Sequence, residues 1–351
     1  MDLEINIYNS NNRSEFESKF SGVLKDLDIY YHPSFLSCDA KMQGGEYEIF
    51  TAESKNGVWI YPYILLPIKD STFFDICSPY GYAGPFCNEL DLFKNAEIHF
   101  NEYIKSKSIV TEFVRYHYDY NKNSESRFSE NCVNIENRTI VLLHTNQPQN
   151  EIWENSFSGT NRNLVRKIEK ENYSFKWKTF DENDVIIFQK MYEATMRNSN
   201  ASDFYFFDSD FYKNLIVELG EALKIAFVEK DGIIFSTSLF FLSGKYITYY
   251  LSARNLDFPK INASNFMLSK VSFWASENGF HLMNFGGGLS NDENDSLFKF
   301  KRNFSKEIAP FFIGKKIHNS EKYAALIENY KATKGSENYE KVKNILQFYR
   351  I

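Results

Sequence analysis

Apolar and polar positions alternate with two distinct periods along the first half of this chain, and each period predicts one kind of element. Residues 14–27 carry apolar side chains three and four positions apart, the spacing of a helix that buries one face. Two apolar runs on either side of Asn56-Gly57 are typical of a hairpin, because this dipeptide favours a tight turn. The elements expected before residue 151 are a helix, a hairpin, a second helix and two strands: 14–27, 46–53 with 58–68, 90–107, 109–118 and 138–144.

The second half repeats this order in outline. Turn signals at Asp231-Gly232 and Ser243-Gly244 divide an apolar stretch into a three-stranded meander, and a helix over 262–278 leads to a strand over 281–285. The recurrence of hairpin, helix and strand predicts an internal duplication of one α+β unit. The expected domains are 1–151 and 152–316, followed by a helical tail, 317–351, that packs back on the N-terminal domain.

The stretch 281–305 holds the strongest candidate chemistry. Its apolar run ends in three glycines, Gly286–Gly288, and the following segment interleaves aromatic side chains with Lys299, Lys301 and Arg302. Free backbone N–H groups, cations and aromatic walls together predict an anion site. A strand, a glycine turn and an amphipathic segment with solvated lysines explain the same pattern without a ligand.

Composition and charge narrow the class of protein. With 43% hydrophobic and 17% aromatic residues the chain can bury sizeable cores, and its net charge of −6 argues against a protein that coats DNA. The four cysteines show no metal-ligand spacing, so no metal site is expected. The N-terminus lacks the features of a signal peptide, and no apolar run approaches the roughly 18 residues of a membrane span. We therefore expect a cytoplasmic protein without a transmembrane segment.

Several motifs, taken in their order and spacing, resemble those of the FemAB family, whose members transfer aminoacyl groups onto cell-wall precursors. The helix pair, antiparallel meander, helix and strand of the second half are also similar to the layout of the GNAT acyltransferase fold. The matching segments are Ser78–Pro85 (SPYGYAGP), the basic helix Arg162–Lys170, Tyr249–Ala253 (YYLSA), Asn262–Asn265, Phe285–Gly288 (FGGG) and Leu297–Ser305 (LFKFKRNFS).

The resemblance implies an α+β fold of two GNAT-like domains, each a mostly antiparallel mixed sheet flanked by helices, with the acceptor in a cleft between them. It places Phe300 and Lys301 at the donor end of the site. The donor-binding residues expected on this basis are Phe300, Lys301, Arg302, Gly286, Gly287 and Tyr250, and the acceptor-binding residues are Arg197, Tyr205, Tyr82, His117 and Arg115. The chain departs from some family members in having no room for a long helical hairpin in its second domain. It also lacks the R/Q-x-x-G-x-G/A pyrophosphate loop of ordinary CoA-dependent GNAT enzymes.

Acyl transfer to an amine needs aligned reactants and stabilisation of the charge that develops on the carbonyl oxygen. No Ser-His-Asp or Cys-His arrangement is evident, so direct attack on an activated donor is expected. Lys301 is the candidate for electrostatic stabilisation. His117 and Asp295 are candidates for a general base, although a structural role explains either residue better than a catalytic one.

Three functions remain open from the sequence. The first is an aminoacyltransferase that uses aminoacyl-tRNA, bound at the RNA's acceptor end, and an amine of a cell-envelope precursor, either a peptidoglycan precursor or a nucleotide- or lipid-linked amino sugar. The second is an acyl-CoA-dependent N-acyltransferase acting on an amino sugar in surface-polysaccharide biosynthesis. The third is a non-catalytic double-GNAT binding protein. No tightly bound cofactor is expected in any of them.

Overall fold

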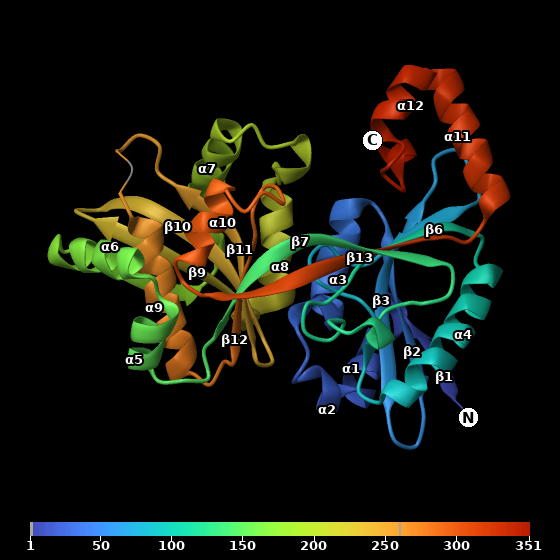
Figure 1. The fold of residues 1–351 in the computed structure, drawn as a ribbon, viewed down its shortest axis with the longest axis horizontal. Helices are drawn as coiled ribbons and strands as arrows, with labels where there is room; N and C mark the ends of the chain where they lie inside the picture. Colours follow the sequence, from blue (N-terminus) through green and yellow to red (C-terminus); the bar gives the residue numbers. More distant parts are fainter. Residues whose placement is uncertain (1–2, 260) are drawn as a thin grey trace. The chain divides into compact units, whose positions relative to one another are not determined.

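The computed structural model describes residues 3–259 and 261–351, which divide into two compact units. Unit 1 contains the chain up to Lys19 together with 39–137 and 310–351, and unit 2 contains 20–38 and 138–309. Each unit is a mixed sheet with helices packed against it (Figure 1). The predicted α+β class and the repetition of one unit are thereby confirmed.

Unit 1 is built on a sheet of six strand segments in the order β1-β2-β3-β4-β6-β13. β4 and β6 run parallel and are joined by helix α4, whereas the other neighbours are antiparallel. The strands are β1 (Glu4–Tyr8), β2 (Glu46–Glu53), β3 (Val58–Pro67), β4 (Phe74–Cys77), β6 (Ile109–Arg115) and residues 313–317 of β13 (Glu307–Ile317), with β5 (Phe86–Cys87) paired to β3. Helix α4 (Leu90–Ser106) packs its apolar side against an aromatic core that includes Trp59, Tyr61 and Phe128.

Unit 2 repeats this plan with the order β7-β12-β11-β10-β9-β8. β11 and β12 are its parallel pair, joined by helix α9 (Ala263–Glu277), whose side chains form one core with Ile247, Met283 and Phe285. The strands are β7 (Cys132–His144, of which 138–144 belong to this unit), β8 (Ser174–Thr179), β9 (Leu223–Lys230), β10 (Ile233–Ser243), β11 (Tyr246–Arg254) and β12 (Leu282–Gly287).

The remaining helices connect or cover these strands. They are α1 (Arg13–Lys19), α2 (Ser21–Leu24), α3 (Pro33–Gln43), α5 (Gln149–Glu151), α6 (Gly159–Lys170), α7 (Glu182–Asn198), α8 (Ser209–Leu219), α10 (Ser296–Arg302), α11 (Ser320–Lys334) and α12 (Ser336–Val342). The short helical turns are η1 (Ser10–Asn12), η2 (Ile29–Tyr31), η3 (Ser124–Ser126), η4 (Ile152–Ser156), η5 (Asp203–Tyr205), η6 (Gly220–Ala222) and η7 (Phe348–Arg350). Within the described ranges, no helix has the length and apolar character needed to cross a membrane.

The division into units differs from the expected domain limits, which followed the polar loops near residues 151 and 316. Both observed limits fall inside long strands, because β7 pairs with β12 from His144 back to Ile140, while the end of β13 pairs with β6. The segment 20–38 belongs to unit 2, where Ser243 donates a hydrogen bond to the Leu27 carbonyl at 2.8 Å. Such long-range pairing leaves no local signal in the sequence.

One further expectation differs in detail. The helix expected over 14–27 is broken into α1 and α2 at Phe20. The interleaved segment after the glycines forms the short helix α10. The tail is helical as predicted and belongs to unit 1, where Arg350 pairs with Asp75 on β4.

Candidate functional site

Lys301 lies on helix α10, whose start is fixed by the carboxylate of Asp295. One oxygen of this carboxylate accepts hydrogen bonds from the backbone N–H groups of Leu297 and Phe298, both at 2.9 Å. Its other oxygen accepts from Leu289 and Ser290 at 3.0 and 3.1 Å. Asp295 therefore caps the helix and closes the preceding loop at the same time.

The ammonium group of Lys301 is buried against the end of β12. Its Nζ donates a hydrogen bond to the carbonyl of Gly287 at 2.7 Å, and the side chain is only 8% exposed. Burial lowers the pKa of this group to about 8, although the nearby Asp295 carboxylate acts in the opposite direction. Arg138 donates to the next carbonyl, that of Gly288, at 3.0 Å. Two cations thus hold two consecutive carbonyls of the glycine segment.

The three glycines meet steric demands of the fold. Gly286 adopts φ +73° at a register shift between β12 and β7, a conformation that side chains rarely tolerate. A Cβ at Gly287 would lie 2.8 Å from the Thr139 carbonyl oxygen, and one at Gly288 would lie 2.6 Å from Oδ1 of Asp295. The N–H of Gly286 already donates to Oδ1 of Asn284 at 2.7 Å. The structure therefore does not support the expected anion site of free N–H groups at this glycine.

The parallel strands β11 and β12 separate close to this segment. Among the described residues their pairing consists of three steps and ends at Thr248 opposite Asn284. Immediately beyond that point, β11 carries a bulge at Tyr250, whose ring lies 4.1 Å from that of Phe241. Bulges at the point where strands part are frequent beside active sites, since they redirect side chains out of the regular sheet.

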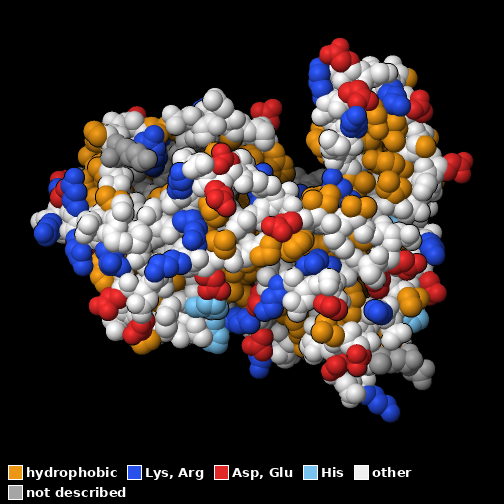
Figure 2. All heavy atoms as spheres, viewed as in Figure 1, with side chains coloured by type: hydrophobic (Ala, Val, Ile, Leu, Met, Phe, Trp, Pro, Cys, Tyr) orange, Lys and Arg blue, Asp and Glu red, His pale blue; other side chains and the backbone are white. Residues whose placement is uncertain are grey.

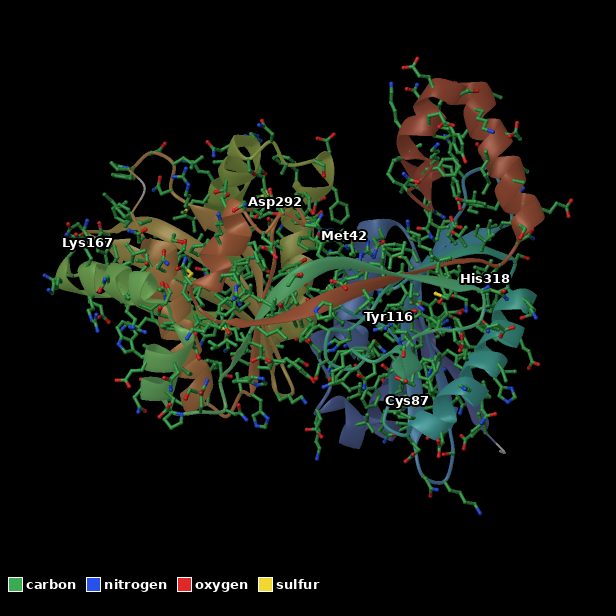
Figure 3. All side chains as sticks on the ribbon, in the orientation of Figure 1. Met42, Cys87, Tyr116, Lys167, Asp292 and His318 are labelled. Carbon is green, nitrogen blue, oxygen red and sulfur yellow. The ribbon has the colours of Figure 1, made fainter. Side chains whose placement is uncertain are left out.

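The basic side chains of α10 are not gathered at one point. Lys299 and Arg302 line a pocket of about 360 Å³, whereas Lys301 reaches back to Gly287. Two carboxylates, Asp292 and Glu293, share the pocket, and Asp292 is labelled in Figure 3. The other lining residues are Thr139, Ser290, Asn291, Phe298 and Ile308. The expected cluster of three cations around one anion is therefore wrong in geometry.

The three remaining donor-site and acceptor-site candidates in unit 2 are exposed or only partly buried. The Arg197 side chain is 70% exposed and pairs with Glu193 at 2.8 Å. Tyr205 is partly buried in η5, and its ring packs edge-on against Phe204. Phe300 is partly buried, and its ring packs against Phe304 in the α9 core. These side chains stay candidates for substrate contact.

His117, in unit 1, is fully buried and forms hydrogen bonds with nearby backbone N–H groups. Its Nδ1 accepts hydrogen bonds from the N–H groups of Asp119 and Tyr120 at 3.2 and 3.3 Å. Its ring is stacked on Tyr118 and Tyr120 at 4.3 and 4.0 Å. An imidazole nitrogen that accepts two N–H groups has no free lone pair for a substrate proton, so the geometry favours a structural role. Asp295 is disfavoured as a base too: despite its partial burial, four backbone N–H groups lower its pKa.

Arg115 and Tyr82 belong to an aromatic part of unit 1. The Arg115 guanidinium lies 4.7 Å from the ring of Phe113 and 5.4 Å from that of Tyr80. Tyr82 packs edge-on against Tyr118 and Phe311. Both residues stay candidates for acceptor binding.

Sequence reasoning missed Asp39 on α3, close to Arg115. The Asp39 carboxylate is 3% exposed and accepts hydrogen bonds from the Tyr80 N–H at 3.1 Å and from Gln43 at 2.6 Å. Burial raises the pKa of Asp39 to about 6, and the Tyr80 N–H and Arg115 offset part of that rise. The signal in the sequence that could have identified Asp39 is the presence of an aspartate among the apolar positions of a helix.

Comparisons with known proteins agree with this architecture. A family model described as an acetyltransferase (GNAT) domain matches residues 155–302. A UDP-N-acetylmuramoylpentapeptide-lysine N(6)-alanyltransferase from Weissella viridescens is 29% identical over 111 residues, which are 31% of this chain and 33% of that protein. The match therefore spans about a third of the relative's length.

Similar solved structures cover nearly the whole chain. The crystal structure of FemX has a TM-score of 0.73 at 13% identity, covering 93% of this chain and 99% of that one. The structure of L-PGS from Bacillus licheniformis has a TM-score of 0.57 at 12% identity, covering 90% and 94%. These likenesses establish the fold of the whole chain.

The expectation about the co-substrate, aminoacyl-tRNA with acyl-CoA as the alternative, needs correction. The name of the Weissella relative gives the alanyl group and its lysine acceptor but no tRNA donor. Two lysines on β8 are also paired with carboxylates, Lys176 with Glu229 at 2.6 Å and Lys178 with Asp184 at 2.8 Å. Figure 2 likewise shows Lys and Arg side chains interspersed with Asp and Glu. The expected co-substrate, aminoacyl-tRNA with acyl-CoA as the alternative, is therefore not supported.

The chain therefore has a FemX-like fold, and its residues 155–302 match a GNAT acetyltransferase domain.

Proposed function

We propose that the protein is an acyltransferase that moves an aminoacyl group from an activated carboxyl donor onto an amine of a cell-envelope precursor. The observation that carries the proposal is the buried Lys301 ammonium, held at the Gly287 carbonyl where β12 ends. The likeness of the chain to an alanyltransferase supports the reaction class.

In the proposed reaction the acceptor amine attacks the donor carbonyl directly. A C–N bond forms, the bond between the carbonyl carbon and the leaving oxygen or sulfur breaks, and the proton released by the amine passes to the leaving group. Lys301 acts on the negative charge that develops on the carbonyl oxygen. One such donor contributes about 3–4 kcal/mol to transition-state stabilisation.

The raised pKa values of three cysteine thiols disfavour a covalent intermediate on these cysteines. Burial raises the pKa of Cys77 to about 12 and that of Cys87 and Cys132 to about 11. A thiol with such a pKa is almost entirely protonated at neutral pH and is a poor nucleophile. Direct transfer needs no such group, because alignment of two bound reactants alone supplies about 7–11 kcal/mol.

We propose a peptidoglycan precursor as the acceptor, since the Weissella relative is named for the lysine of a UDP-N-acetylmuramoylpentapeptide. The test is to incubate the purified protein with this nucleotide pentapeptide and a small alanyl thioester, and to follow the pentapeptide by mass spectrometry. We expect one alanyl group on the lysine side chain, formed faster than in the protein-free reaction. A UDP-amino sugar serves as a second acceptor in parallel. Binding of either acceptor without any enzyme-dependent acylation would overturn the proposal in favour of a binding protein.

A further inference from the structure

Two buried polar side chains face each other at the last paired step of β11 and β12. Thr248 is directly opposite Asn284, and their side chains are 4% and 0% exposed. The hydroxyl of Thr248 and the amide nitrogen of Asn284 have no hydrogen-bond partner within residues 3–259 and 261–351. A buried polar group without a partner lowers stability, so two that face each other require an explanation.

The pair lies on the face of the sheet away from helix α9. The preceding residues on each strand, Ile247 and Met283, point into the α9 core, and side chains alternate along a strand. On the neighbouring strand, the register partner of Thr248 is Phe241, which also contacts the ring of Tyr250. Thr248, Asn284 and the bulged Tyr250 therefore share one face at the point where the strands part.

Unit 1 shows a related arrangement earlier along its own parallel pair, before the last paired step of Cys77 with Phe113. Its parallel pair, β4 and β6, carries Asp75 and Thr111, and the Thr111 hydroxyl donates to Asp75 at 2.6 Å. The last residues of the chain cover these groups: the Tyr349 hydroxyl and Nε of Arg350 each donate to Asp75 at 2.8 Å. Gln347 donates to the Thr111 hydroxyl at 3.1 Å. In unit 1 the polar groups of the parallel pair thus hold a segment of peptide.

In the part of unit 2 that the structure describes, no such hydrogen bonds reach the Thr248 hydroxyl or the Asn284 amide nitrogen. We propose that these two side chains bind an uncharged carbonyl-containing group of the substrate. The Asn284 amide donates to the carbonyl oxygen, and the Thr248 hydroxyl bonds the adjoining oxygen or N–H. The inference rests on the proposed acyltransferase function and adds two recognition residues to it.

The chemistry of the pair selects an ester, thioester or amide over a charged ligand. Neither side chain ionises, and Asn284 Oδ1 is already engaged by the Gly286 N–H, which leaves its NH₂ group to point at the ligand. A carboxylate or phosphate placed here would meet one amide and one hydroxyl but no cation from this pair. Such a neutral carbonyl comes either from the acyl donor or from a peptide bond of the acceptor.

The decisive variant is Thr248→Val, which keeps the shape and removes the hydroxyl. Because that hydroxyl has no partner in the free protein, we expect an unchanged or higher Tm together with a loss of about tenfold in kcat/KM. The matched control is Thr237→Val on β10, whose hydroxyl is also buried and without a partner in the described chain, and which should alter neither quantity. Thr111→Val is the structural contrast and should lower Tm, since its hydroxyl bonds Asp75.

Kinetics with the alanyl thioester and the UDP-N-acetylmuramoylpentapeptide identify the source of the carbonyl. The concentration of each substrate is varied while the other substrate is saturating. The substrate whose KM rises in Thr248→Val is the one that Thr248 and Asn284 bind. Asn284→Asp provides a second variant, since it keeps the acceptor for the Gly286 N–H and removes the donor. It should raise the KM of the same substrate.

The outcomes separate this inference from the proposed function. An active wild-type protein whose Thr248→Val and Asn284→Asp variants show unchanged kinetic constants overturns only the recognition site. If the Tm of Thr248→Val falls as in Thr111→Val while the kinetic constants stay unaltered, the recognition site is also overturned. That result would indicate that a structural water bonds the Thr248 hydroxyl. A wild-type protein that transfers no acyl group in either assay overturns the proposed function, and the recognition site with it.

Discussion

The Lys301 ammonium donates to the Gly287 carbonyl at 2.7 Å, which ties helix α10 to the end of β12. Because Arg138 holds the next carbonyl, that of Gly288, the backbone here is fixed by two cations on successive residues. A lysine positioned in this way is oriented before any substrate arrives, and such preorganisation is what gives an electrostatic group its catalytic effect.

Replacing Lys301 with methionine should therefore affect catalysis much more than folding. We expect kcat to fall about 10²–10³-fold in steady-state alanyl transfer, the range measured when one charge-stabilising donor is removed. Tm should change little, because methionine fills a buried site without the cost of burying a charge. The control is Lys299→Met, whose Nζ donates to Asn294 near the surface and which should keep kcat. A Lys301→Met protein with wild-type turnover would contradict the role.

The pH dependence of catalysis distinguishes the two chemical uses of a lysine whose pKa burial has lowered to about 8. An electrostatic role needs the charged form, so kcat should fall as pH rises through about 8. A general-base role would give the opposite profile, with kcat rising over the same range. The Lys301→Met variant should lose this transition, which assigns it to the residue.

The same lysine makes stability depend on pH with a defined sign. Its pKa is about 8 when folded, against 10.5 for the free side chain. Between these values the unfolded chain binds more protons, so the contribution of Lys301 to the free energy of unfolding rises with pH. Urea denaturation at about pH 7.5 and about pH 9.5, below and above the folded pKa, should show this increase in the free energy of unfolding of the wild type. The increase should be smaller in Lys301→Met.

A methyl group at Gly288 should disturb the start of helix α10. Its Cβ would lie 2.6 Å from Oδ1 of Asp295, the atom that accepts hydrogen bonds from Leu297 and Phe298. We expect Gly288→Ala to lower the free energy of unfolding by about 1–3 kcal/mol. Gly22→Ala is the matched control, because a Cβ there meets nothing within 4 Å. Equal stability of the two variants would show that the Asp295 cap can move aside freely.

Asp39 should reduce stability at neutral pH. Burial raises its pKa to about 6, against 3.8 for the free side chain, so between these values the folded protein binds more protons than the unfolded chain. Stability is therefore lost as pH rises from about 4 to about 6. We expect Asp39→Asn, which can still accept from the Tyr80 N–H, to raise Tm at pH 7 and to have little effect near pH 4. A variant that is less stable than the wild type at both pH values would contradict this.

Local signals in the sequence predicted the parts of this fold that depend on neighbouring residues. The turns at Asn56-Gly57, Asp231-Gly232 and Ser243-Gly244 joined the expected strands. At the last two turns Asp231, Gly232 and Gly244 adopt positive φ, which glycine and short polar residues permit. The repetition of helix, meander, helix and strand was also predicted.

The features that the sequence did not predict arise from contacts between distant residues. Asp39 is buried against Tyr80, which lies 41 positions away. The limits between the two units, at 137/138 and 309/310, fall inside strands β7 and β13 rather than at the expected residues 151 and 316. At Lys301, the interleaved aromatic and basic residues suggested a single cationic face, but the helix begun by Asp295 turns Lys301 inward and Lys299 outward.

The end of the chain should contribute measurably to the stability of unit 1 through one ion pair. Arg350 meets the fully buried carboxylate of Asp75 at 2.8 Å and also donates to the carbonyls of Leu66 and Pro67. Arg350→Met would leave a buried charge short of its cation, and we expect a loss of about 3 kcal/mol by chemical denaturation. The matched control is Arg13→Met, whose partly exposed pair with Glu17 is worth less than about 1 kcal/mol.

A double-mutant cycle with Asp75→Asn isolates the pair from the rest of the contact. If the two charges stabilise each other, the variant with both changes should be less destabilised than the sum of the two single variants. Strict additivity would mean that Arg350 acts through its carbonyl contacts alone. In that case the tail would cover β4 and β6 by packing and backbone hydrogen bonds, and the charge of Asp75 would have to be compensated by the hydroxyl groups of Thr111 and Tyr349.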